Sequence, residues 1–143
     1  MESIQKLMDG QHRALIKLLE DFLKAFKENP IGSGMILEKF KINAEKHFSV
    51  EDFAIFNAHE AMNSENVKDT FQLMEDHQAI LALLNKIQNE LGKEIKKDVF
   101  ELEAMLKNHQ EFEDNEFYPN LDENLNENHR LLIISRIKQK IEV

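Results

Sequence analysis

The long apolar stripes of this sequence constrain its fold more than any other feature. Apolar residues recur in steps of three and four along four segments, at residues 3–28, 35–58, 67–91 and 94–117. This is the spacing of one face of an α-helix. The segments are separated only by short turn sequences, such as Asn29–Pro30 and residues 63–66. Helices of this length joined by short turns run antiparallel to their neighbours.

The sequence therefore predicts an all-α fold, an antiparallel up-down-up-down four-helix bundle followed by a short fifth helix over residues 122–141. We expect residues 1–143 to form a single domain, because no linker or low-complexity tract divides them. Scarce glycine (4) and proline (2) agree with long helices. Gly10 lies inside the first segment and leaves open a helix start nearer Asp9.

Charge and cysteine content exclude several classes of function. The chain has 27 acidic and 18 basic residues, a net charge of −9, which argues against nucleic acid and anionic membranes as partners. No apolar run approaches the roughly 20 residues that span a bilayer, and the N-terminus lacks the apolar core of a secretory signal. A cytoplasmic location is therefore expected. Without cysteine, thiolate metal sites, iron–sulfur clusters and thiol catalysis are excluded.

Each of the four long stripes carries one histidine where an apolar residue is expected. These histidines are His12, His47, His77 and His109. Glutamate follows two of them at a spacing of four, as Glu51 and Glu113. Residues i and i+4 lie on one helical face, so both members of each pair point into the bundle. Counting about 1.5 Å per residue from the turns places all six side chains at one depth, with each helical hairpin supplying two histidines and one glutamate.

Two glutamates in an apolar core are costly if they are ionised and unpaired. A pair of metal ions removes this cost, because each glutamate can bridge both cations and two imidazoles can cap each cation. Mixed nitrogen and oxygen ligands suit iron, with manganese and zinc as alternatives. The other interpretation is a metal-free polar network in the core of a helical interaction protein. A metal assay on the purified chain distinguishes the two.

Other chemically active residues are assigned structural roles. We expect His59 and His129 at the surface or at helix caps. Glu116 is expected at an exposed helix end, with a spare-ligand role as the alternative. Tyr118 is interpreted as a packing residue, with donation to the site as the alternative. The ten phenylalanines are predicted to form core, among them Phe22, Phe48, Phe53, Phe71 and Phe112.

The order His, His-x3-Glu, His, His-x3-Glu on four helices resembles the hemerythrin-like, HHE cation-binding family over essentially the whole chain. The resemblance implies a non-haem di-iron centre with oxo or hydroxo and carboxylate bridges. It also implies that each hairpin's histidines cap one iron and that both glutamates bridge. The residues that cap the first iron are then His12 and His47, those that cap the second are His77 and His109, and the bridging residues are Glu51 and Glu113.

Two positions depart from the oxygen-carrying members of the family. Leu81 stands where those proteins have a further histidine, four residues after the third-helix histidine. Asp114 stands at the offset of their aspartate, although Glu113 fits the helical face better. Four histidines leave open positions on both irons. We therefore expect a protein that binds or reacts with a small oxidant (dioxygen, nitric oxide or peroxide); the alternative is reversible oxygen binding, or iron or oxygen sensing, without turnover.

Overall fold

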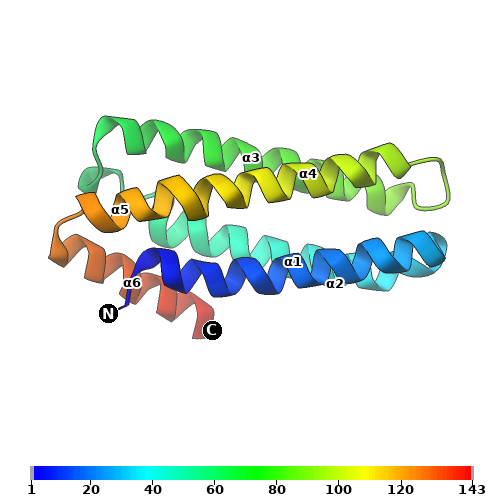
Figure 1. The fold of residues 1–143 in the computed structure, drawn as a ribbon, viewed down its shortest axis with the longest axis horizontal. Coiled ribbons are helices and arrows are strands. Elements are labelled where there is room, and N and C mark those ends of the chain that lie inside the picture. The colour runs from blue at the N-terminus through cyan, green and yellow to red at the C-terminus, as the bar shows by residue number, and fades with distance from the viewer. Residues whose placement is uncertain (1, 143) are drawn as a thin grey trace.

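Four long helices lie side by side and antiparallel, as the apolar stripes predict (Figure 1). The computed structural model describes residues 2–142. The long helices are α1 (Ile4–Glu28), α2 (Gly34–Val50), α3 (Ser64–Asn89) and α4 (Lys96–Phe112). Each buries its apolar face, so the predicted all-α bundle is confirmed. No helix within the described residues is long and apolar enough to cross a membrane.

A polar cap fixes the start of the first helix. The backbone N–H of Lys6 donates a hydrogen bond to the Ser3 hydroxyl, and α1 begins at Ile4. Gly10 therefore lies inside the helix, and the alternative start nearer Asp9 is wrong. A glycine inside a helix costs about 1 kcal/mol relative to alanine, a cost that the buried face of α1 outweighs.

Two of the helices widen where the paired glutamates lie. α2 continues without a break into the π-helical segment η2 (Glu51–Phe56), and α4 continues into η4 (Glu113–Phe117). The backbone stays helical at both junctions, with φ −62° and ψ −47° at Glu51 and at Glu113. A π turn holds more residues than an α turn and is frequently found at functional sites. Each His-x3-Glu pair therefore spans the junction between an α-helix and a π turn.

The predicted fifth helix is two helices. α5 (Tyr118–Asn124) continues from η4, and α6 (Glu127–Glu142) follows after a short break. The break lies in an asparagine-rich stretch, residues 124–128, where short polar side chains compete with the helical backbone. α6 packs on the outside of the bundle against η2, α1 and α2, close to the start of α1 (Figure 1).

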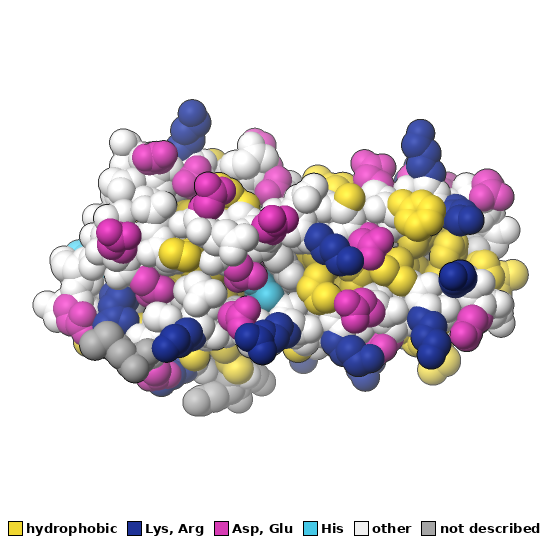
Figure 2. All heavy atoms as spheres, in the orientation of Figure 1, with side chains coloured by type: hydrophobic (Ala, Val, Ile, Leu, Met, Phe, Trp, Pro, Cys, Tyr) yellow, Lys and Arg dark blue, Asp and Glu magenta, His cyan; other side chains and the backbone are white. Residues whose placement is uncertain are grey.

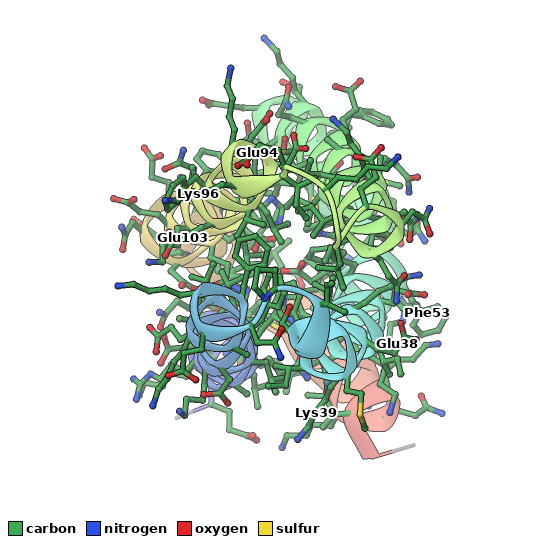
Figure 3. All side chains as sticks on the ribbon, turned by 90° about the vertical axis from the view of Figure 1, so that its right-hand side faces the viewer. Glu38, Lys39, Phe53, Glu94, Lys96 and Glu103 are labelled. Carbon is green, nitrogen blue, oxygen red and sulfur yellow. The ribbon has the colours of Figure 1, made fainter. Side chains whose placement is uncertain are left out.

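A polar layer divides the bundle core into two apolar parts. One part lies toward the α1–α2 turn and includes Leu19, Phe40 and Leu102. The other lies toward α5 and α6 and includes Phe56 and Leu121. Seen along the bundle, side chains from all four long helices fill the space between them (Figure 3). The two cores clamp the polar layer from both sides and so fix its position along the helices.

Three of the ten phenylalanines predicted as core are exposed, namely Phe53, Phe71 and Phe100, of which Phe100 is 59% exposed and also wrongly predicted. The other seven are buried or half-buried, namely Phe22, Phe26, Phe40, Phe48, Phe56, Phe112 and Phe117. Phe53 and Phe71 are 49% and 56% exposed, so their prediction as core residues is wrong. Phe53 lies on the outer side of η2 (Figure 3), with Lys140 Nζ 4.8 Å from its ring centroid. Phe71 follows the buried Thr70, so a turn of 100° points it away from the core and onto the ring of His59.

Candidate metal centre

Six polar side chains form the layer between the two parts of the core. They make two overlapping groups that could hold a metal ion, namely His12, His47, Glu51 and Glu113, and Glu51, His77, His109 and Glu113. Within each group, one ligand atom of every residue lies within 4.8 Å of the others. None of the six is more than 5% exposed, and histidine side chains of any kind occupy only small areas of the face shown in Figure 2. The structure thus brings all six predicted residues together at one depth.

Each imidazole presents its Nε2 atom to the two glutamates. The shortest Nε2 to carboxylate distances are 3.2 Å for His12 to Glu113, 3.2 Å for His47 to Glu51, 3.0 Å for His77 to Glu51 and 3.2 Å for His109 to Glu113. Each carboxylate therefore contacts one histidine from each helical hairpin. The two glutamates lie between the halves of the site, which is the placement that a bridging ligand requires.

Several of these buried atoms lack a hydrogen-bond partner within the described part of the chain. They are Nε2 of His12, His47 and His109, and Oε1 of Glu113. Their neighbours are close, but the approach angles are not those of hydrogen bonds. Buried polar atoms are almost always paired, and imidazole nitrogens and carboxylate oxygens are good ligands for iron, manganese and zinc. Two cations next to the shared glutamates would satisfy these atoms, so the residues present fit a dinuclear metal site.

The other nitrogen of each imidazole, Nδ1, has a partner outside the centre. The pairs and their distances are His12 with Asp114 at 2.8 Å, His77 with Asp52 at 3.0 Å, His109 with Asp76 at 3.1 Å and His47 with Gln11 at 2.9 Å. An imidazole that binds a metal through Nε2 is neutral and carries its proton on Nδ1, which then donates to the partner oxygen. These four contacts fix each ring with its Nε2 atom toward the centre.

The supporting partners follow a repeat that sequence reasoning missed. Gln11 and Asp76 each directly precede the first histidine of a helical hairpin. Each accepts a hydrogen bond from Nδ1 of the histidine on the next helix. Asp52 and Asp114 each follow a shared glutamate and support a histidine on another helix. The signal was present in the sequence, because Glu-Asp follows both His-x3 motifs. From the sequence alone, Asp114 stands out only as an alternative to Glu113.

Comparison with known proteins agrees with this arrangement. The hemerythrin HHE cation binding domain matches residues 3–121. The chain belongs to this family. Comparisons with curated proteins and with solved structures gave no significant match. Membership of the HHE family implies metal binding, and the buried histidine and glutamate cluster could hold a metal.

Tyr118 completes the HHE cluster in this chain. Its side chain is fully buried, and its hydroxyl donates hydrogen bonds to Glu51 and, at 3.1 Å, to Glu113. Its interpretation as a packing residue alone is therefore wrong, and the alternative of donation to the site is what the structure supports. Tyr118 lies five residues after Glu113, so η4 gives the spacing by which the hydroxyl reaches both carboxylates.

The carboxylates change the protonation of the buried imidazoles. Burial alone lowers the pKa of His12, but the hydrogen bond to Asp114 and the nearby Glu113 carboxylate outweigh burial and raise the pKa to about 11. Burial also opposes the charged form of His109, yet the charge of Glu113 and the hydrogen bond to Asp76 raise its pKa to about 12. Without a bound cation, these two rings therefore keep their extra protons at neutral pH.

The same balance operates at the other shared glutamate. Burial lowers the pKa of His77, but its hydrogen bonds to Asp52 and Glu51 raise it to about 9. Burial raises the pKa of Glu51, whereas the charge of His47 and the close approach of the other imidazoles hold this pKa well below its usual range. A metal ion entering the cluster must displace these protons.

The remaining residues singled out in the sequence lie away from the centre. Glu116 is exposed, as expected for the helix end. His59 is half-buried, with Nε2 2.9 Å from the Thr70 hydroxyl, and His129 is half-buried near the start of α6. Leu81 packs against the apolar core beside the site. The position of the further histidine in oxygen carriers is therefore apolar in this chain.

Proposed function

We propose that this chain is a non-haem di-iron protein that binds or reacts with a small oxidant, namely dioxygen, nitric oxide or peroxide. One observation carries the proposal. Three imidazole Nε2 atoms and a glutamate oxygen are buried without a hydrogen-bond partner in the described residues, around two carboxylates shared by both halves. Membership of the HHE family supports metal binding by this chain. A cytoplasmic location stays a prediction.

The proposed ligands divide by hairpin. His12 and His47 would hold one iron, His77 and His109 the other, and Glu51 and Glu113 both. When bound, the iron pair would supply redox electrons and open coordination positions for a small ligand. The chain itself holds each ring in orientation through Nδ1, keeps a phenolic proton beside both carboxylates, and excludes bulk water by burial. The apolar Leu81 supports open positions on the irons.

Iron loading tests the metal site directly. After anaerobic loading with ferrous iron and desalting, we expect about two iron ions per chain. His77→Ala and Glu113→Ala should each lower this number, because each removes a proposed ligand. His129→Ala is the matched control and should leave it unchanged, since His129 lies outside the cluster. Well under one iron per wild-type chain would overturn the proposal and favour a metal-free polar core.

Ligand mixing tests the chemistry. Reduced, loaded protein is mixed anaerobically with dioxygen, nitric oxide or peroxide in turn, and absorption spectra are recorded. We expect new charge-transfer absorption with at least one of them. A dioxygen adduct that releases dioxygen intact under vacuum would favour reversible binding over turnover. No spectral change with any of the three would contradict the proposed oxidant chemistry while leaving the metal site intact.

A further inference from the structure

The two halves of the site repeat each other with one change of charge. In the first half, Nδ1 of His47 on α2 lies 2.9 Å from the side-chain oxygen of Gln11. In the second half, Nδ1 of the equivalent His109 on α4 lies 3.1 Å from a carboxylate oxygen of Asp76. The other two histidines both face aspartates. One half is therefore supported by two carboxylates, and the other by one carboxylate and one neutral amide.

This difference bears directly on cation affinity. A carboxylate that accepts the Nδ1 proton makes the imidazole a more basic ligand, and it places a negative charge near the bound cation. An amide oxygen orients the ring equally well but carries no charge. Replacing such an outer partner typically changes metal affinity by about 10-fold to 100-fold. The half with Asp76 should therefore hold a cation more tightly than the half with Gln11.

The charges that line the clefts next to Gln11 and Asp76 also favour tighter cation binding in the Asp76 half. A cleft of about 570 Å³ reaches Gln11 and His47, and its lining includes Lys46, Lys140 and Glu45. A second cleft of about 460 Å³ reaches Asp76 and His109. Its charged lining residues are Asp69 and Asp76, with no lysine or arginine among the described residues that line it. The field at the first cleft repels cations relative to the second.

We propose that the two metal positions are unequal, and that the His77/His109 position retains a divalent cation more tightly than the His12/His47 position. Asp76 and Gln11 are the residues that set the difference. The inference rests on the proposed dinuclear site and adds to it an order of occupation. A limiting supply of metal fills the Asp76 half first, and a chelator empties the Gln11 half first.

Matched half-site variants test the order. His47→Ala disables the Gln11 half, and His109→Ala disables the Asp76 half; both keep the shared glutamates. Cobalt(II), which is stable in air and coloured in protein sites, is titrated against a competing chelator, with circular dichroism to confirm folding. We expect His47→Ala to bind cobalt at least about tenfold more tightly than His109→Ala. Equal affinities, or the reverse order, would overturn the inference.

Changing the charge at Gln11 and at Asp76 tests whether these two residues cause the difference in affinity. In the His109→Ala chain, Gln11→Glu should tighten cobalt binding by about tenfold; in the His47→Ala chain, Asp76→Asn should weaken it by a similar factor. If these changes leave both affinities unmoved, Gln11 and Asp76 do not set the difference. If neither half-site chain nor the wild type binds cobalt, the dinuclear site itself fails, which is a distinguishable result.

A kinetic measurement on the chain with all four histidines covers the case in which a half-site variant does not fold. Cobalt extraction by excess chelator should show two phases in the wild type. Gln11→Glu should slow the fast phase, and Asp76→Asn should speed the slow one. A fast phase unaffected by Gln11→Glu, or a slow phase unaffected by Asp76→Asn, would contradict the inference.

Discussion

At the scale of single residues, the two nitrogens of each imidazole have separate tasks. Nε2 faces the shared glutamates, and Nδ1 donates to an oxygen outside the centre. The first task could be predicted, because a histidine on an apolar stripe is visible in the sequence. The second could not be predicted from stripes, since Asp76 and Gln11 occupy positions next to the stripe that are ordinarily solvated. Only adjacency to the ligands, repeated in both hairpins, marks them.

Tyr118 provides a residue-scale prediction. Its hydroxyl donates to both shared glutamates in a fully buried position. Tyr118→Phe leaves these carboxylates without that donor, and an unpaired buried acceptor costs about 1–3 kcal/mol. We expect the free energy of unfolding of the metal-free protein to fall by about that amount in urea titrations.

The metal ligands themselves are untouched by this change. Iron content after anaerobic loading should therefore remain that of the wild type, which separates loss of the hydroxyl from collapse of the site. An unfolding free energy equal to that of the wild type would show that the Tyr118 hydroxyl does not stabilise the two carboxylates.

At the scale of elements, the apolar period predicts helices but not their widening. Residues 51–56 contain neither proline nor glycine, so nothing local marks the π turn of η2. η4 does have a signal, because Pro119 cannot donate to the carbonyl four residues before it. Phe53 is a different case, because it lies about 200° around the helix from Glu51 and the period itself places it outside the core; only its apolar side chain suggests otherwise. The helices could thus be predicted from the repeated apolar spacing, whereas the widening of the helix at η2 could not.

The start of α1 depends on another element, which gives a second prediction. The Asp122 carboxylate, on α5, accepts hydrogen bonds from the backbone N–H groups of Ile4 and Gln5 at 2.9 Å and 3.0 Å. The first N–H groups of a helix have no partner within it. Asp122→Ala should therefore lower the unfolding free energy by about 1–2 kcal/mol without changing iron content.

A surface carboxylate serves as the control for this change. Asp21 pairs with Lys17 one turn away, on the exposed face of α1. Asp21→Ala should cost at most about 0.5 kcal/mol, because exposed pairs of this kind contribute little. Equal losses for Asp21→Ala and Asp122→Ala would mean that α5 does not cap α1.

At the scale of the whole molecule, a polar layer between two apolar cores needs either protons or cations to balance its charge. The metal-free protein uses protons: the pKa values of His77, His12 and His109 are raised to about 9, about 11 and about 12. A raised histidine pKa stabilises the fold fully below the unfolded value of 6.5. This stability declines as the pH rises and is lost above the raised value.

The lowered pKa of Glu51 gives a pH dependence of stability with the opposite sign. The pKa of Glu51 lies well below its usual 4.5, so its stabilising effect is present above that pH and is lost as the pH falls through the lowered value. The metal-free protein should therefore be most stable at mildly acidic to neutral pH. It should lose stability progressively as the pH rises above about 7, because the unfolded chain has then given up its imidazole protons while the folded chain still holds them, up to the raised pKa values of about 9 to about 12.

Bound cations replace those protons, so the loaded protein should behave differently. Its stability should hold between pH 7 and pH 10, and acid should release the metal as protons return to the ligands toward about pH 5. Thermal unfolding of the two forms across this range checks the prediction. General alkaline effects on lysines act on both forms, so the difference in Tm between them is the signal. A difference that stays constant from pH 7 to pH 10 would mean that protons and cations do not compete for the cluster.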